Sequence, residues 1–169
     1  IFGAGDRFLN LFARLQAVFP LMPLDCDGAR FQPVWVDDVA SAVLACLKDE
    51  GLPMSTVGQT FECAGPDVLP LGELVRLAGR HGSTERPILP LPMAIGRLQA
   101  FMMELAPGEP LMSRDNLAAM SVDNVATRQW PDLSALGIVP TSVHTVAPTY
   151  LGQRGGRSQL LDYRHEAGR

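Results

Sequence analysis

Residues 31–43, FQPVWVDDVASAV, join a strand-like segment to a helix-like segment without a loop between them. Residues 31–36 are rich in aromatic and β-branched side chains, which is typical of a packed strand. Asp37 and Asp38 follow, and their carboxylates suit the free amides at a helix N-terminus, so we interpret them as caps and assign them no catalytic role. Apolar residues then recur at helical spacing: Val39, Ala40, Val43, Leu44 and Leu47. The stretch predicts a strand-to-helix unit of an α/β fold.

Other parts of the chain carry similar local patterns. Asp6 is placed to cap a helix that runs to a stop before Pro20. A second helix is predicted from Pro70, and Gly79 and Gly82 are expected to help end it. Its apolar side comprises Leu71, Leu74, Val75, Leu77 and Ala78, and the first helix is expected to bury Phe8, Leu9, Leu11, Phe12, Leu15, Val18 and Phe19. We also expect a short strand at 59–64, an extended edge at 86–92, an amphipathic helix at 93–105 and a last short helix at 143–151.

Composition limits the classes of function. A chain of 169 residues fits one domain, and a net charge of -4 gives no reason to expect a nucleic-acid partner. Cys26, Cys46 and Cys63 are too scattered for a metal site and are interpreted as buried small hydrophobes in a reducing cytosol. The sequence has no apolar run near the ~20 residues needed to span a bilayer. We therefore expect a cytoplasmic protein, and the family resemblance of the next paragraph implies the alternative of one peripheral to the inner membrane.

Four further stretches accompany residues 31–44 in order: IFGAGDRF from Ile1, QTFECAGP from Gln59, LPLGELVRLAG from Leu69 and VAPTYL from Val146. As a set they resemble the C-terminal half of extended and atypical short-chain dehydrogenases/reductases, the NAD-dependent epimerase/dehydratase family. Within that group they are similar to the bacterial proteins related to the nucleotide-binding accessory subunit of respiratory complex I. The resemblance covers residues 1–151.

The resemblance implies an α/β fold, namely the C-terminal substrate-binding part of a Rossmann-like fold that lacks its N-terminal dinucleotide-binding half. Residues 1–151 would form the substrate-binding region. Residues 152–169 carry four arginines against Asp162 and Glu166 and are expected to form a flexible basic tail. The missing N-terminal half would be the first partner of this chain.

Features that the family needs for chemistry are missing from the chain. It has no G-x-x-G-x-x-G, the turn whose amides meet a pyrophosphate. Family members pair an acid/base tyrosine with a lysine four residues later, but Tyr150 is followed by Arg154 and Tyr163 by Ala167. We assign no catalytic, cofactor-binding or metal-ligating residue. NAD or NADP is expected in the full-length protein, and no cofactor for this chain alone.

The resemblance nevertheless indicates residues near a substrate. It implies that the turn at Phe2 and Gly3 approaches the substrate and the nicotinamide end of the cofactor, and that residues near Gln32 line the pocket. Arg114 is the cation expected to hold an anionic group, because a guanidinium pairs bidentately with phosphate. Each has a structural alternative: a plain strand-to-helix turn, an amide bonded to neighbouring backbone, and a surface salt bridge.

Three interpretations of function follow. In the first, the chain is the substrate-binding and docking half of an NAD(P)-dependent oxidoreductase of the epimerase/dehydratase or complex I accessory type, with an unknown small-molecule substrate. In the second, it is a non-catalytic structural module of a respiratory-type complex. In the third, it is an unrelated and complete α/β binding domain. The helix at 93–105 either faces the core or meets a protein partner, a quinone-like lipid or a membrane.

Overall fold

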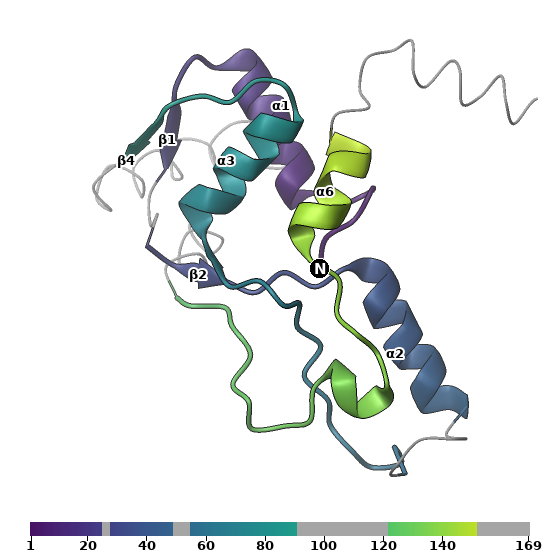
Figure 1. The fold of residues 1–169 in the computed structure, drawn as a ribbon. Helices are drawn as coiled ribbons and strands as arrows, with labels where there is room; N and C mark the ends of the chain where they lie inside the picture. The colour runs from purple at the N-terminus through teal and green to yellow at the C-terminus, as the bar shows by residue number, and fades with distance from the viewer. Residues whose placement is uncertain (25–27, 49–54, 91–121, 152–169) are drawn as a thin grey trace, which may run out of the picture.

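The computed structural model describes residues 1–24, 28–48, 55–90 and 122–151. The helix expected at 93–105, Arg114 and the tail at 152–169 lie outside these described residues. The described chain is a mixed α/β fold (Figure 1). Its elements are α1 (Phe8–Val18), β1 (Met22–Leu24), β2 (Arg30–Phe31), α2 (Val36–Lys48), β3 (Leu69–Pro70), α3 (Leu71–His81), β4 (Ile88–Pro90), the 3-10 helix η1 (Leu133–Leu136) and α6 (Val143–Leu151).

The strands form short pairs. β1 runs parallel to β4, and β2 runs antiparallel to β3. The strand expected at 31–36 is therefore shorter than predicted, since only its beginning lies in β2 and Trp35 makes an isolated parallel bridge to Phe2. Pro33 has no amide hydrogen to donate, which interrupts a continuous ladder. The extended edge expected at 86–92 is confirmed at Ile88–Pro90, where β4 lies, and residues 91–92 lie outside the described residues.

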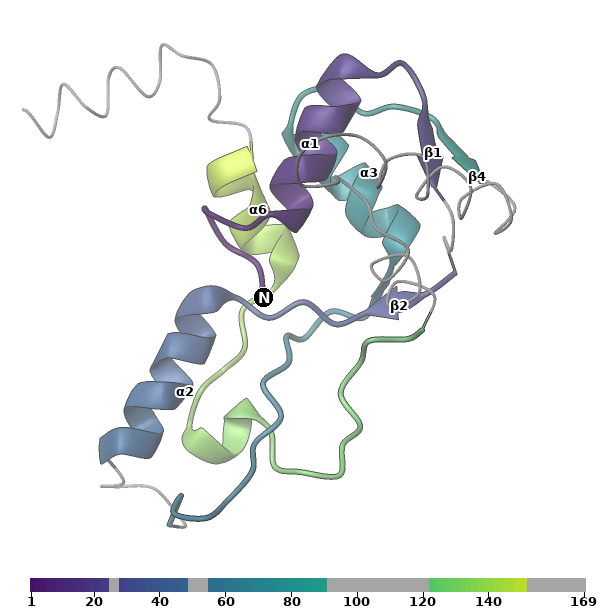
Figure 2. The same ribbon diagram turned by 180° about the vertical axis from the view of Figure 1, so that it is seen from behind.

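The main core lies between α1, α3 and α6, which are grouped together in Figures 1 and 2. The predicted apolar side of α3 is confirmed, because all five of its residues are buried. The last helix is also confirmed, as α6. Gly79 does not end α3 as predicted. It lies inside the helix, where an added Cβ would come 2.2 Å from the Gln16 side-chain oxygen.

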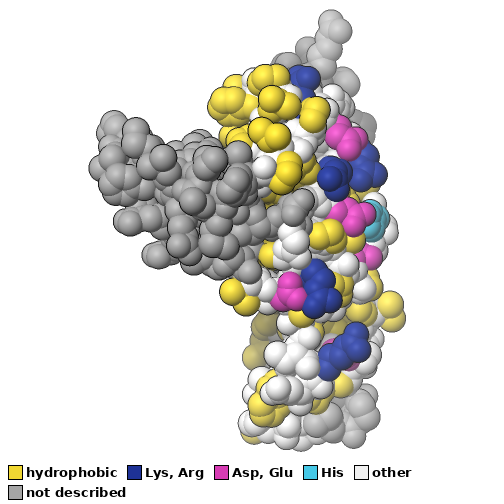
Figure 3. Space-filling model, turned by 90° about the vertical axis from the view of Figure 1, so that its left-hand side faces the viewer, with side chains coloured by type: hydrophobic (Ala, Val, Ile, Leu, Met, Phe, Trp, Pro, Cys, Tyr) yellow, Lys and Arg dark blue, Asp and Glu magenta, His cyan; other side chains and the backbone are white. Residues whose placement is uncertain are grey.

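α1 is rotated relative to the predicted apolar side. It ends before Pro20 as expected, but Val18 and Phe19 are exposed, while the polar side chains of Asn10 and Gln16 are buried. The reason is the close contact between Gln16 and α3, where its amide donates to Val75 O at 2.8 Å. Figure 3 shows hydrophobic side chains gathered at the upper end of the face that carries β1.

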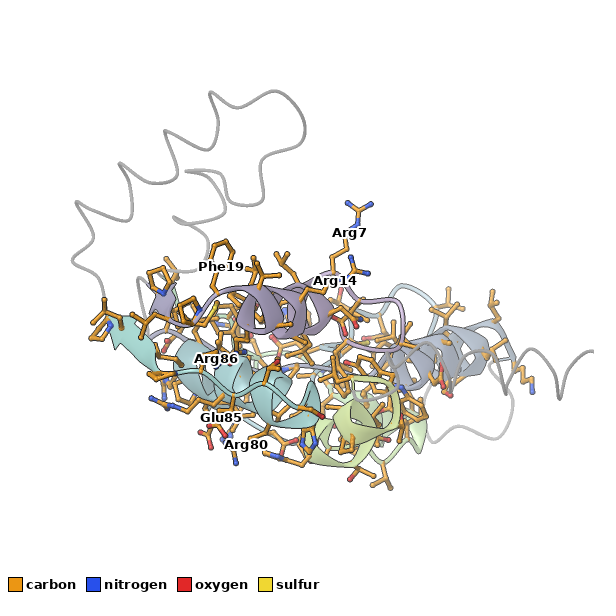
Figure 4. The ribbon with its side chains drawn as sticks, turned by 90° about the horizontal axis from the view of Figure 1, so that it is seen from above. Arg7, Arg14, Phe19, Arg80, Glu85 and Arg86 are labelled. Carbon is orange, nitrogen blue, oxygen red and sulfur yellow. The ribbon has the colours of Figure 1, made fainter. Side chains whose placement is uncertain are left out.

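Arg86 links the segment after α3 to α1 by hydrogen bonds. Its backbone amide donates to Gln16 Oε1 at 3.1 Å, and its Nε donates to the Gln16 backbone oxygen at 3.1 Å. Figure 4 shows Arg80 and Glu85 on the other side of α3, where they form a 3.8 Å ion pair, and Arg14 projecting outward from α1. Both the nitrogen and the oxygen of the buried Gln16 amide have hydrogen-bond partners, as buried polar groups generally do.

A second, smaller core joins α2 to η1. It consists of Val34, Ala42, Leu133 and Leu136. The apolar residues that recur at helical spacing in α2 include Val43, Leu44 and Leu47, and the exposed fractions of these three are 55%, 55% and 76%. The helix packs on η1 through its opposite face. The three apolar residues do lie on one side of the helix, but no part of the described chain covers their side chains.

Two further sequence predictions concern smaller features. The short strand expected at 59–64 is reduced to one parallel bridge between Glu62 and Asp132. Cys63 is exposed and Cys46 half-buried, so the expectation of buried cysteines is wrong for Cys63, which lies on this irregular segment. Cys26 falls outside the described residues. No described helix is both long enough and apolar enough to cross a membrane.

Candidate functional site

The parallel pair of Phe2 and Trp35 defines an edge where two helices begin. Phe2 N donates to Val34 O and Val36 N donates to Phe2 O, both at 2.9 Å. The turn to α1 follows Phe2, and α2 starts directly after Trp35. Because the strands are parallel, their carboxyl ends meet at one edge, which is where open α/β sheets place their ligands.

The turn after Phe2 is held tightly against α2. Gly3 is buried, and a Cβ there would come 2.7 Å from Cγ1 of Val36. The ring of Phe2 is 3% exposed and belongs to the main core. Asp6 closes the turn, since its Oδ1 accepts from Leu9 N at 2.6 Å, which confirms the predicted cap of α1. Phe2 and Gly3 therefore set the position of the turn at the carboxyl edge.

Two distant carboxylates hold the start of α6. Asp38 Oδ2 accepts from Thr141 N at 2.7 Å, and its Oδ1 accepts from the Thr141 hydroxyl at 3.1 Å. Asp67 Oδ2 accepts from Ser142 Oγ and Val143 N at 2.7 and 2.9 Å. The interpretation of Asp38 as a cap of its own helix is therefore corrected: its buried side chain binds residues far away in the sequence. It still lies in the first turn of α2, where its charge suits the helix dipole.

Replacing Asp38 tests this assignment. We expect Asp38→Ala to lower the free energy of unfolding by about 2 kcal/mol, because a buried acceptor of two hydrogen bonds is lost. Asp37→Ala is the matched control: it removes an exposed carboxylate from the same turn and should cost about 0.5 kcal/mol. Urea unfolding of both variants measures the difference, and equal losses would show that only the helix dipole matters.

The C-terminal end of α6 contacts the turn that precedes α1. Tyr150 OH donates to Asp6 Oδ2 at 2.7 Å across 144 positions of sequence. Burial, followed by the hydrogen bond and the charge of Asp6, raises the pKa of the Tyr150 phenol well above its usual value. The phenol therefore keeps its proton at neutral pH and serves as a donor.

The pH dependence of stability should reveal this pair. The unfolded chain loses the tyrosine proton near pH 10 whereas the folded chain retains it, so this contribution is complete below pH ~10 and falls as the pH rises further. We expect Tyr150→Phe to cost about 1 kcal/mol at pH 7 and to flatten the decline above pH 10. Thermal unfolding from pH 7 to 11 measures both. An unchanged alkaline slope in the variant would contradict the assignment.

Gln32 lies further back from the carboxyl edge, and both the nitrogen and the oxygen of its amide bond to backbone groups. Its Nε2 donates to Gly65 O at 2.7 Å, and its Oε1 accepts from Ala126 N at 2.9 Å. The amide thus joins two segments far apart in the sequence to the strand. This geometry agrees with the alternative in which Gln32 bonds to backbone. Arg114 lies outside the described residues.

Two charged side chains attach residues 122–132 to the same region. Arg30 donates from Nε to Asp123 Oδ2 at 2.9 Å, and this contact raises the pKa of the guanidinium and lowers that of the carboxyl. Glu62 accepts from the Thr127 hydroxyl and from Arg128 N, and the Thr127 contact is the main cause of its lowered pKa. Both pairs are exposed, and they orient this segment.

The described part of the site positions a turn and the starts of two helices. No cluster of three His, Cys, Asp or Glu that could hold a metal occurs among the described residues. The sequence patterns did not indicate the roles of Asp38, Asp67 and Tyr150. Their partners are 75 to 144 positions away, so no local pattern could have indicated them.

Comparison with solved structures supports the fold class. The chain aligns with the crystal structure of gox2253 at a TM-score of 0.52 and 19% sequence identity, over 97% of this chain and 45% of that one. At this level of identity the likeness concerns the fold alone. It agrees with a mixed α/β, Rossmann-like arrangement containing parallel strands. No protein-family model matches the chain.

The sequence itself is similar to named subunits of a respiratory enzyme. It is 34% identical over 149 residues to "NADH dehydrogenase [ubiquinone] 1 alpha subcomplex subunit 9, mitochondrial" of Mus musculus, covering 83% of this chain and 37% of the mouse protein. The corresponding Arabidopsis thaliana subunit is 31% identical, covering 82% of this chain and 36% of that protein. The "NADH-ubiquinone oxidoreductase 40 kDa subunit, mitochondrial" of Neurospora crassa is 26% identical, covering 89% of this chain and 38% of its own length. The chain thus spans well under half the length of these relatives.

Proposed function

We propose that the chain is the ligand-binding and docking part of a longer protein that serves as an accessory subunit of an NADH-ubiquinone oxidoreductase. The observation that carries the proposal is the similarity to such subunits from animal, plant and fungus over 82–89% of the chain. In this role the chain performs no catalysis by itself. It contributes a ligand site and protein contacts to a peripheral part of a membrane-associated complex.

The ligand site in this proposal is the carboxyl edge. Phe2 and Gly3 shape its floor through the turn packed on α2, and Gln32 positions the strand behind it. Arg114 binds an anionic group of the ligand, and NAD or NADP is held by another part of the longer protein. Residues 1–151 form this region and residues 152–169 a basic tail.

Native electrophoresis tests the accessory role. The full-length protein, tagged at its gene, should comigrate with NADH:ubiquinone oxidoreductase activity in detergent-solubilised membranes, and deletion of the gene should reduce the amount of assembled enzyme. A tagged soluble dehydrogenase of the same organism is the control for carry-over. Migration only as a free protein, together with normal assembly in the deletion strain, would refute the accessory role.

A second function is favoured by the position of the turn at the carboxyl edge. In this alternative the chain is the substrate-binding half of an NAD(P)-dependent epimerase/dehydratase-like oxidoreductase. Fluorescence titration of the purified full-length protein with NADPH and NADH, followed by measurement of their oxidation with ketone and nucleotide-sugar substrates, separates the two. Binding without turnover supports the accessory role, and turnover supports the enzyme.

A further inference from the structure

Residues 127–131 form a short loop whose backbone is held by a single neighbouring residue. Glu62 Oε1 accepts from Thr127 N at 2.9 Å and from the Thr127 hydroxyl, and Glu62 Oε2 accepts from Arg128 N at 2.7 Å. The backbone amide of Glu62 also donates to Pro131 O at 2.8 Å. Glu62 therefore binds both ends of the loop and fixes its conformation.

The backbone of Arg128 is held in a strained conformation. Its φ of 60° lies in the left-handed region, which residues other than glycine seldom occupy. Such a conformation persists only where the surrounding contacts impose it, and the hydrogen bonds of Thr127 N and Arg128 N to Glu62 do so here. Strain of this kind is concentrated at functional sites, which makes the loop a candidate for one.

The loop exposes two side chains of the types that contribute most to protein–protein binding. Trp130 is 53% exposed, and Arg128 is exposed as well. Tryptophan and arginine are among the residues most enriched at the energetic centres of interfaces. Figures 1 and 2, drawn from opposite sides, both show residues 122–132 at the lateral margin of the molecule, away from α1, α3 and α6. Both side chains are therefore open to a partner.

The charges of this segment indicate a carboxylate on the partner. Among the described residues the Arg128 guanidinium forms no ion pair. The two acids of residues 122–132 are bound elsewhere, Asp123 to Arg30 and Asp132 to Ser134. A guanidinium of this kind is suited to pair with a carboxylate through two hydrogen bonds. The same acids argue against an anionic lipid surface, which binds clusters of Lys and Arg.

We propose that the loop of residues 127–131 is a docking contact of the accessory subunit on the oxidoreductase, with a partner protein surface that offers a carboxylate to Arg128 and an apolar hollow to Trp130. This inference rests on the proposed function and names a contact through which it is carried out. Because Glu62 fixes the loop before binding, little conformational freedom is lost on docking. Most of the affinity of the contact comes from the two exposed side chains.

Substitution of these side chains in the full-length protein tests the proposal. Tagged Trp130→Ala and Arg128→Glu variants, expressed in the gene-deletion strain, should each comigrate with NADH:ubiquinone oxidoreductase activity about tenfold less than the wild type. Phe19→Ala and Arg14→Glu are the matched controls and should comigrate like the wild type, because both side chains are exposed at α1 (Figure 4). Phe19 is 51% exposed, close to the value for Trp130. Equal comigration of the loop variants and the controls would overturn the proposal.

Photo-crosslinking identifies the occupant without depending on a loss of binding. p-Benzoylphenylalanine in place of Trp130 should crosslink to a subunit of the oxidoreductase in membranes, and the same group in place of Phe19 should not. Crosslinks from position 130 only to lipid, or only to a second copy of this chain, would overturn the proposal. If a substituted loop does not fold, as judged by its urea unfolding midpoint, the crosslink still decides.

Failure of this contact can be distinguished from failure of the accessory role. If the wild-type protein does not comigrate with the oxidoreductase, the accessory role is refuted and the contact with it. If the wild type comigrates but position 130 crosslinks to no subunit of the oxidoreductase, the contact alone is refuted and the accessory role stands.

Discussion

Gly65→Ala is expected to destabilise the protein by about 3 kcal/mol, because the added methyl group meets backbone rather than a movable side chain. A Cβ on Gly65 would come 1.9 Å from the Pro33 carbonyl oxygen. Relief of the clash would separate the Gly65 segment from the strand before α2. It would also break the 2.7 Å hydrogen bond from Gln32 to Gly65 O. Chemical denaturation of the variant and the wild type measures the loss.

Gly5→Ala is the matched control for this prediction. A Cβ on Gly5 meets nothing within 4 Å, so the same substitution should change the free energy of unfolding by no more than about 0.5 kcal/mol. The midpoints and slopes of the two denaturation curves give both free energies of unfolding. If both variants were equally stable, the close approach of Gly65 to Pro33 would not exist in solution.

Gln16→Leu is expected to cost about 2 kcal/mol although it replaces a buried polar residue by an apolar one of similar size. Gln16 is fully buried, and its amide serves α1, α3 and the chain after α3 at once. The substitution leaves Arg86 N without its acceptor and removes the 2.8 Å bond to Val75 O. Leaving such groups unpaired costs more than the added apolar contact contributes.

Gln129→Leu provides the comparison, because the side chain of Gln129 is exposed. Its unfolding free energy should stay within about 0.5 kcal/mol of the wild type. Hydrogen exchange at Arg86 and at the α1–α3 contact should increase in Gln16→Leu alone. A variant with unchanged stability and exchange would show that the amide network is dispensable.

The sequence by itself determined the elements that depend on local chemistry. The periodic apolar side of α3, the cap at Asp6, the end of α1 before Pro20 and the short last helix all follow from neighbours within a few positions. The strand-to-helix passage at residues 31–43 was also predicted, although Pro33 shortens the strand. Each of these features needs information from only a few neighbouring residues.

Tertiary structure decided which faces are covered and what the polar side chains bind. The residue type and position of Asp38 suggest a helix cap, yet its hydrogen-bond partner Thr141 is 103 positions away. Gln16 appears as a polar interruption of α1, but Gly79 makes room for it against α3. The pattern of α2 predicts an apolar side, and only packing reveals that this side remains open. Periodicity records that a face is apolar, whereas its burial depends on residues distant in sequence or on another part of the protein.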